Sequence, residues 1–282
     1  MIFTHTRKYF FLILILACKG KSQVNRSANL SLHSGNTVQV NAFQDSSCKL
    51  SSQIKNYDVS IKAVLNKNDC ITLRDFTDNK SNIDYCLVLD INSLKTNIYL
   101  KSELKLGEID SLSFKNSNYY KLAQKIIVQN YNSSGIDSTV NHGYSLTLDL
   151  CPSTKKFDQD FFDFLFNHQV APFYVCVSGK WMEKHYDDLK YIIKKNKNDD
   201  IVWVNHSYSH YYDPSKKVDN NFMLNENTDF DVEVLNNEKL MIENGIVPSS
   251  FFRFPGLISD KKLCQKVISY GLIPLSSKAW LA

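Results

Sequence analysis

The hydrophobic pattern of the chain changes about halfway along. Between residues 37 and 104, short runs alternate apolar and polar side chains and are separated by turn-forming residues. The runs are Val38–Val40, Val59–Val64, Cys70–Leu73, Tyr85–Leu89 and Asn97–Leu100. Alternation with a period of two is typical of strands with one buried face, and several such strands in series predict a small all-β barrel or sandwich.

A different pattern begins at residue 143, after a connecting segment (105–142) with one predicted helix, Tyr119–Gln129. From here strand-like runs alternate with helix-like runs. The predicted strands are Tyr144–Leu150, Pro172–Val177, Ile201–Asn205, Phe251–Phe254 and Leu272–Leu275, and the predicted helices are Gln159–Asn167, His185–Asn196, Asp229–Asn244 and Asp260–Tyr270. Repeated β-α units predict an α/β domain with a parallel sheet, either doubly wound or part of a β/α barrel. In both architectures the chemistry gathers at the C-terminal ends of the strands.

The start of the chain has the pattern of an export signal. A basic segment up to Lys8 precedes the apolar run Tyr9–Ala17, which is shorter than the roughly 20 residues that span a bilayer. The run ends at Cys18 in a segment that resembles the bacterial lipobox, whose cysteine is acylated and becomes the mature N-terminus. We expect a lipoprotein-type signal peptide (1–18), a flexible tether (19–36) and an exported protein, anchored by lipid to a bacterial membrane of the cell envelope. The alternative is an ordinary cleaved signal with a chance cysteine.

The composition of the chain limits the kinds of partner that it can bind. Apolar residues make up 43% of the chain and charged residues 22%, so a packed interior is expected. The 33 basic and 29 acidic residues are spread through the sequence, and without a basic block we expect no nucleic-acid partner. The seven cysteines include no CxxC pair, and their disulfide connectivity cannot be deduced. Cys151 and Cys176 fall in or beside predicted strands, where we expect small buried hydrophobic side chains.

Polar side chains follow three of the predicted strands where those strands end. Asp149 closes the first strand, His206 and His210 follow the third, and Arg253 lies in the fourth. A carboxylate in an apolar strand must be paired, solvated or functional, since burying it alone is costly. The alternative for Asp149 is a helix cap, although Pro152–Thr154 supply better start signals for the next helix. A buried guanidinium needs a carboxylate partner, whether the pair is catalytic or structural.

The two histidines are four residues apart. On a helical turn this spacing puts both imidazoles on one face, where they can bind one metal ion through neutral nitrogens. Because the chain has seven histidines, the spacing can also arise by chance in an unrelated α/β domain. Its place directly after an apolar strand favours the metal site.

Together and in this order, these segments resemble the polysaccharide deacetylases of the NodB-homology family. Thr147–Asp149 is similar to the family's T-F-D-D segment, His206–His210 to H-[ST]-x-x-H, and Arg253–Gly256 to its arginine-proline segment. The resemblance covers 143–282. It implies a partial or distorted β/α barrel that removes acetyl groups from polysaccharides by a metal-activated water.

The resemblance also implies roles for the candidate residues. Asp149 would be the catalytic base, His206 and His210 would bind a divalent metal, zinc foremost, and Arg253 would orient and tune Asp149. Leu150 stands where the family has a second aspartate that binds the metal. Two protein ligands remain, below the three typical of catalytic zinc, unless Asp149 coordinates in place of acting as base. The family's final L-x-H motif would lie beyond Ala282, so we expect an incomplete domain.

Residues 37–104 resemble a bacterial SH3-like domain more distantly. That resemblance implies a binding module for cell wall or for a protein partner. Two functions follow for the whole chain. One is a deacetylase acting on envelope polysaccharide or peptidoglycan. The alternative is a noncatalytic envelope lipoprotein that binds glycan or a protein partner.

Overall fold

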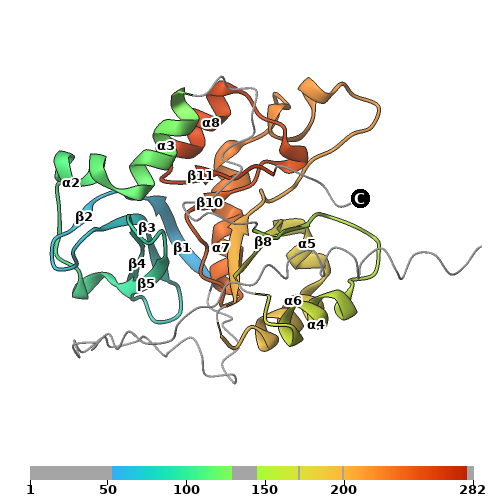
Figure 1. Ribbon diagram of the computed structural model, residues 1–282, viewed down its shortest axis with the longest axis horizontal. Coiled ribbons are helices and arrows are strands. Elements are labelled where there is room, and N and C mark those ends of the chain that lie inside the picture. Colours follow the sequence, from blue (N-terminus) through green and yellow to red (C-terminus); the bar gives the residue numbers. More distant parts are fainter. Residues whose placement is uncertain (1–52, 129–144, 171, 199, 278–282) are drawn as a thin grey trace, which may run out of the picture. The chain divides into compact units, whose positions relative to one another are not determined.

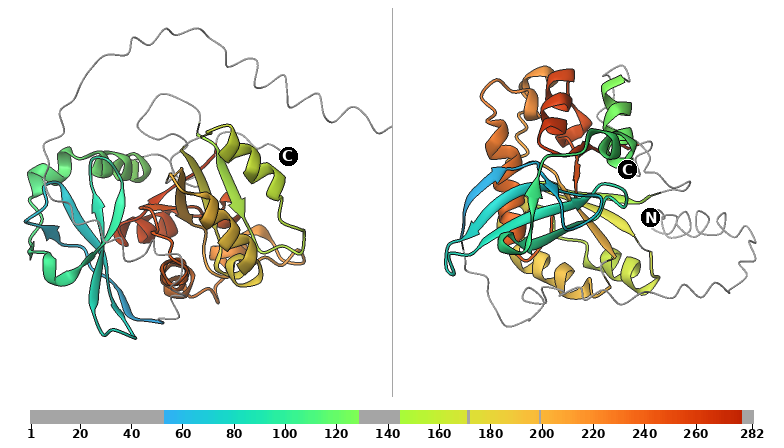
Figure 2. Two further views of the ribbon diagram at one scale, coloured as in Figure 1. Left: turned by 90° about the horizontal axis from the view of Figure 1, so that it is seen from below. Right: turned by 90° about the vertical axis from the view of Figure 1, so that its left-hand side faces the viewer.

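The computed structural model describes residues 53–128, 145–170, 172–198 and 200–277. The predicted signal peptide with Cys18, the tether and the strand Val38–Val40 lie outside the described residues. All described residues belong to one compact unit that begins at Val40. This unit holds two sheets of different kinds, drawn in Figures 1 and 2.

The first sheet is antiparallel and has six strands in the order β5-β4-β3-β2-β6, with β1 also paired to β3. Its strands are β1 Ile54–Val59, β2 Ala63–Val64, β3 Cys70–Asp78, β4 Asp84–Asp90, β5 Thr96–Leu100 and β6 Leu106–Gly107. The expectation of one strand over Val59–Val64 was wrong, because β1 ends at Val59 and β2 begins at Ala63. There the amide of Lys62 donates to the hydroxyl of Thr72 at 3.0 Å, so a side chain takes the place of a ladder partner. An antiparallel sheet agrees with the all-β expectation, and the SH3-like assignment stays a prediction.

The second sheet is parallel, and its strand order β11-β10-β9-β8-β7 follows the chain without reversal. Its strands are β7 Thr147–Leu150, β8 Phe173–Val177, β9 Ile201–Asn205, β10 Phe251–Phe252 and β11 Ile273–Pro274. A doubly wound sheet reverses its strand order at a switch point, and these five described strands do not. They follow the order of a β/α barrel, whose closure stays a prediction.

The helices lie between these strands and after the first sheet. The α-helices are α2 Ser111–Asn116, α3 Asn118–Val128, α4 Gln159–Asn167, α5 Gly179–Lys184, α6 Tyr186–Lys195, α7 Asn237–Glu243 and α8 Lys261–Ser269. The shorter helical segments are η2 Lys101–Glu103, η3 Val218–Asn220, η4 Phe222–Leu224, the π-helical η5 Val232–Asn236 and η6 Pro255–Leu257. The cap of α4 is Asp158, whose side chain accepts from the amide of Phe161, and not a residue of Pro152–Thr154 as expected. None of the described helices is both long and apolar enough to cross a membrane.

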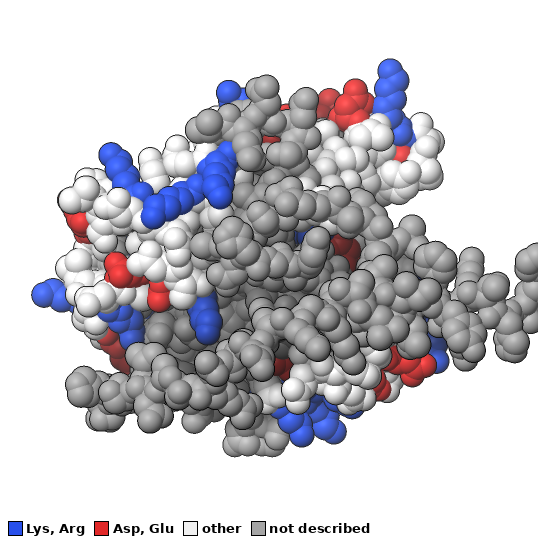
Figure 3. Space-filling model, in the orientation of Figure 1, with Lys and Arg blue, Asp and Glu red and all other residues white. Residues whose placement is uncertain are grey.

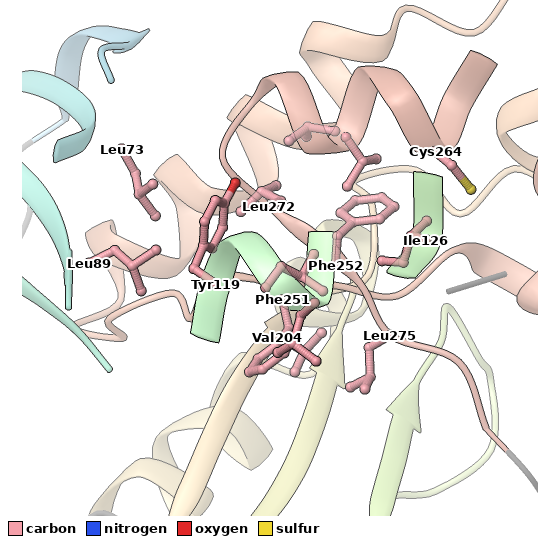
Figure 4. Packing of buried hydrophobic residues seen from close by; sticks show 14 of the residues in the cluster. Leu73, Leu89, Tyr119, Ile126, Val204, Phe251, Phe252, Cys264, Leu272 and Leu275 are labelled. Carbon is pink, nitrogen blue, oxygen red and sulfur yellow. The ribbon is translucent and has the colours of Figure 1, made fainter. Parts of the chain in front are cut away.

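Both faces of the parallel sheet are covered, and the side chains of β8 show how. Tyr174 and Cys176 join the cluster that also holds residues of the first sheet, α3 and α8, whereas Phe173, Val175 and Val177 join a second cluster under α4, α5 and α6. Figure 4 shows the first cluster, in which Leu73 and Leu89 approach Tyr119, Phe251 and Leu272. Strands buried on both faces read as continuous apolar runs, which is the reason β8 and β9 were found from sequence.

A buried ion pair joins β3 to α7. Arg74 donates to Glu238 twice, from Nε to Oε2 at 2.7 Å and from Nη2 to Oε1 at 3.0 Å, and neither side chain is exposed. The Nη1 group of Arg74 donates to the carbonyls of Leu73 at 2.8 Å and Tyr270 at 2.6 Å, and Tyr57 donates to Glu238 at 3.1 Å. The antiparallel sheet is therefore tied to the second half of the chain by polar as well as apolar contacts.

Charged side chains of both signs are mixed on the described surface in Figure 3, where blue and red groups occur near one another. This is the distribution expected from 33 basic and 29 acidic residues spread along the chain. Cys70, Cys86, Cys151, Cys176 and Cys264 carry free thiols.

Candidate metal centre

The residues singled out at the strand ends come together. Asp149 lies in β7, while His206 directly follows β9 and Arg253 directly follows β10. In the structure Arg253 Nη1 lies 3.4 Å from Asp149 Oδ1, and His206 Nε2 lies 4.0 Å from Asp149 Oδ2. Asp149 is 21% exposed whereas the other two side chains are buried. The carboxylate is thus held on one side by protein and open to water on the other.

The segment that carries the two histidines is a strained loop, and the expectation of a helical turn was wrong. Ser207 and His210 both have positive φ, at 65° and 48°. Residues other than glycine adopt this backbone conformation at a cost of order 1–3 kcal/mol. The loop still brings the imidazoles together, with ring centroids 4.9 Å apart. Strain of this kind persists only where surrounding contacts fix the backbone.

Contacts from two sides fix this loop. The amides of Gly179 and Lys180, at the start of α5, donate to the carbonyls of Ser207 and Tyr208 at 3.2 and 2.9 Å. A carbon placed on Gly179 as Cβ would lie 2.2 Å from the Tyr208 ring, so only glycine permits this approach. On the other side, the amide of Ser209 donates to Glu233 Oε2 at 2.9 Å. Neither α5 nor these supporting residues were predicted from the sequence.

A buried amide pair supports the end of β9. Asn237 Nδ2 donates to Asn205 Oδ1 at 2.7 Å and to the carbonyl of Val177 at 3.0 Å. Asn205 Oδ1 also accepts from the amide of Ser207 at 3.0 Å, and Asn205 Nδ2 donates to the carbonyl of Val234 at 2.9 Å. Val234 lies in the π-helical segment η5, a type of irregularity that is frequent at functional sites. The available signal in the sequence was an asparagine at the end of an apolar strand, Asn205, and another within the predicted helix Asp229–Asn244, Asn237.

The environment of His206 fixes which ring nitrogen carries the proton. Its Nδ1 lies 2.9 Å from the carbonyl oxygen of Arg253, and since a carbonyl only accepts, Nδ1 donates its proton there. Burial lowers the pKa of His206, against the attraction of Asp149. The ring is therefore neutral at physiological pH, and its Nε2 lone pair accepts from the Cys151 thiol, whose Sγ lies 3.4 Å away.

His210 offers a free nitrogen. Its Nε2 is buried and has no hydrogen-bond partner among the described residues. Burial and then the neighbouring His206 lower the pKa of His210 to about 4, so this imidazole is also neutral near pH 7. Its ring packs edge-on against Phe222, with centroids 5.7 Å apart. A neutral imidazole with an unused lone pair is the form that binds a metal ion.

A third potential ligand is Cys151, for which the sequence analysis expected only a small buried hydrophobic role. The side chain is half-buried, and its Sγ lies 3.4 Å from His206 Nε2. The ligand atoms of Cys151, His206 and His210 all lie within 4.8 Å of one another. In the absence of an ion, burial and then the charge of Asp149 raise the pKa of the Cys151 thiol to about 12. Cys176 is fully buried as expected.

The polar groups at this site fit a divalent ion. Among the described residues, Asp149 Oδ1 and His210 Nε2 are buried atoms of this site without a hydrogen-bond partner, although Asp149 Oδ1 pairs with Arg253 at 3.4 Å. Such atoms are costly to leave unsatisfied, and their meeting in one place points to a missing ion or ligand. Leu150 takes no part, because it packs with Leu146 and Leu148 in the cluster under the helices.

Comparison with known proteins defines the class of this region. The family described as polysaccharide deacetylase matches residues 137–274. The chain therefore carries a polysaccharide deacetylase domain of the NodB-homology class, and the family expected from the three motifs is confirmed.

Solved structures with some similarity to the chain include two family 4 carbohydrate esterases. The one from Streptomyces lividans, in complex with acetate, is 17% identical with a TM-score of 0.32, over 51% of this chain and 62% of that chain. The one from Bacillus anthracis is 19% identical with a TM-score of 0.40, over 58% and 70%. The Bc1960 peptidoglycan N-acetylglucosamine deacetylase, in complex with a naphthalenyl N-oxidanyl-benzamide, is 20% identical with a TM-score of 0.31, over 52% and 57%. The chain thus spans less than two thirds of the length of the first and third of these proteins.

Proposed function

We propose that this protein removes acetyl groups from polysaccharide or peptidoglycan of the bacterial cell envelope with the help of a divalent ion. The observation that carries the proposal is the meeting of Asp149, His206, His210 and Arg253 at the ends of β7, β9 and β10 in a polysaccharide deacetylase domain. The four groups lie at one edge of the sheet although the first and the last are 104 positions apart in the sequence.

The residues of the chain divide the work. The imidazoles of His206 and His210 would hold the ion, which when bound supplies Lewis acidity toward an acetyl carbonyl and a water. Asp149 is the open carboxylate beside them and takes the proton from the attacking water. Arg253 lies 3.4 Å from Asp149 Oδ1 and holds the carboxylate in one orientation toward the site.

The location in the cell is part of the proposal. The basic start, the short apolar run and Cys18 favour export and acylation at that cysteine. A lipid anchor would keep the catalytic domain beside the glycans of the envelope. The region 37–104 would then serve as a binding module for cell wall or for a protein partner.

The test is acetate release from N-acetylglucosamine oligomers and from an aryl acetate, with protein loaded with zinc. The Asp149→Asn variant should lose activity by about 10²- to 10⁴-fold, the range that a general base contributes, while its metal content stays at the wild-type level. A zinc-loaded protein that releases no acetate from either substrate, or a variant as active as the wild type, would contradict the proposal.

A second candidate is a noncatalytic envelope lipoprotein that binds acetylated glycan or a protein partner. The observation that favours it is Leu150, which stands in place of the family's second aspartate and packs among apolar side chains. The same preparation separates the two functions. Binding of N-acetylglucosamine oligomers by calorimetry without acetate release would support the noncatalytic protein.

A further inference from the structure

We infer that Cys151 is the third protein ligand of the metal centre, so that the site is a Cys-His-His site in which a thiolate stands in for the family's second carboxylate. The inference rests on the metal site of the proposed function and adds to it a ligand, a metal preference and a reason why Leu150 does not abolish the site.

The alternation of β7 puts Cys151 on the correct side of the sheet. Side chains of a strand point to opposite faces in turn. Leu146, Leu148 and Leu150 pack together in the cluster under the helices, so the residues between them face the other side. Asp149 is one of these and lies beside His206 and Arg253. Cys151, two residues further on, continues on the same side and reaches His206.

The distance between the thiol and His206 is the distance that a shared zinc ion requires. Zinc lies about 2.3 Å from sulfur and 2.0–2.1 Å from an imidazole nitrogen, which at a tetrahedral angle separates the two ligand atoms by roughly 3.5 Å. The separation between Cys151 Sγ and His206 Nε2 is 3.4 Å. The His206 atom lies further, at 4.0 Å, from Asp149 Oδ2. The sulfur is therefore closer than the carboxylate to the position of a third ligand.

Both imidazoles are prepared for the same ion. The carbonyl of Arg253 takes the Nδ1 proton of His206 and leaves Nε2 toward the thiol, the arrangement by which a hydrogen bond behind the ring fixes the tautomer of a metal ligand. His210 presents Nε2 without a hydrogen-bond partner among the described residues. All three ligand atoms fit within 4.8 Å of one another. Because 4.8 Å exceeds the roughly 3.5 Å between two ligands of a tetrahedral zinc ion, the side chains must draw closer together when one ion binds.

The third ligand has two consequences for function. Three protein ligands with one open position are typical of catalytic zinc, so the count missing at Leu150 is restored. Asp149 then stays free to move a proton, which removes the conflict between a role as ligand and a role as base. A thiolate is a soft ligand that selects zinc over magnesium or manganese, for which carboxylates are suited. We therefore expect this site to prefer zinc more strongly than an all-oxygen-and-imidazole site would.

Cobalt(II) is the probe, because it occupies zinc sites and a thiolate ligand gives it a charge-transfer band in the near ultraviolet. The full-length protein is titrated with Co²⁺ under reducing conditions, followed by absorption, and Zn²⁺ is then added in competition. The variants are Cys151→Ser, Cys151→Asp and a His206→Ala, His210→Ala double variant. Cys70→Ser is the matched control, since Cys70 is another half-buried free thiol, on β3 of the antiparallel sheet.

The expected result is one equivalent of cobalt with a charge-transfer band in the wild type and in Cys70→Ser. Cys151→Ser should lose the band. Its affinity for zinc should fall by more than about 100-fold, because changes to residues that only support the ligands already lower metal affinity by about 10- to 100-fold. Cys151→Asp should bind without the band. Circular dichroism of each variant shows whether the fold is retained, and Cys151→Asp keeps the test valid if Cys151→Ser is unstable.

The remaining outcomes separate the two proposals. If cobalt binds to the wild type without a thiolate band, and binding is lost only in the histidine variant, the cysteine inference is wrong while the metal site of the deacetylase stands. If the wild type binds neither cobalt nor zinc, the inference and the metal-dependent function both fail. If Cys70→Ser loses the band and Cys151→Ser keeps it, the wrong cysteine has been assigned and the inference is overturned.

Discussion

Replacement of Arg74 by methionine should unfold the protein at a much lower denaturant concentration. Arg74 is fully buried and makes two hydrogen bonds to the equally buried Glu238. Methionine fills much of the same volume but supplies no positive charge. The Glu238 carboxylate would be left in the interior with the Tyr57 hydroxyl as its remaining described donor.

The size of the effect follows from the charge left behind. Removal of one partner of a buried pair costs about 3–5 kcal/mol, because the other charge is then uncompensated. The carbonyls of Leu73 and Tyr270 also lose their contacts to Nη1. Since domains of this kind are stable by only about 5–15 kcal/mol, Arg74→Met should remove a large part of the free energy of unfolding.

Urea unfolding followed by tryptophan fluorescence measures the change. Lys101→Met is the control, because Lys101 forms a 2.8 Å pair with Asp75 at side-chain exposures of 37% and 19%, and a pair near the surface contributes about 0–1 kcal/mol. The double variant Arg74→Met, Glu238→Gln removes the stranded charge and should be more stable than Arg74→Met alone. If Arg74→Met costs no more than Lys101→Met, or if the double variant is as unstable as the sum of the single ones, the charge argument is refuted.

Two further outcomes are expected. Gly179→Ala should weaken zinc binding at least about tenfold, in the range of supporting residues around a metal, because its Cβ would collide with the Tyr208 ring at 2.2 Å and displace the histidine loop. Gly245→Ala is the control for zinc binding measured by competition with a chromophoric chelator, since at its φ of 78° alanine strains the backbone but its Cβ meets no atom within 4 Å. Burial raises the pKa of Tyr119 to about 12, partly offset by Arg74, so the folded state keeps a proton that the unfolded state loses above pH 10. The free energy of unfolding should therefore keep its full value below pH 10 and fall by about 2–3 kcal/mol as the pH rises to about 12. In urea unfolding, the free energy of Tyr119→Phe should fall less over this pH range. An unchanged pH profile would contradict the assignment.

The parts of the fold that could be predicted were those with local signals. The bounds of α4, Gln159–Asn167, and of β9, Ile201–Asn205, were predicted correctly, because a helical period or an apolar run ended at clear turn residues. The helix α5 was missed, since six residues give too short a period to recognise. The positive φ angles of Ser207 and His210 leave no pattern in a sequence, and the same four-residue spacing therefore suggested a helical turn.

Site residues that belong to the ordered family motifs were predicted from the sequence, whereas contacts that depend on three-dimensional packing were not. The meeting of Asp149 and Arg253 follows from the rule that parallel strand ends share an edge. Cys151 was overlooked because the family's ligand stands at position 150, although the alternation of β7 would have placed residue 151 beside Asp149. The partnership of Arg74 with Glu238 could not be predicted, since a contact between residues so far apart in sequence depends on the complete fold.

The Arg74 pair also bears on how the protein is made. Its two partners are 164 positions apart, and a chain growing at roughly 5–20 residues per second needs about 8–33 s to pass from one to the other. During that time β3 has been synthesised but the helix that neutralises its arginine has not. Because burial of Arg74 without Glu238 would leave its charge unpaired, we expect the first sheet to bury Arg74 only after the C-terminal half of the chain is present.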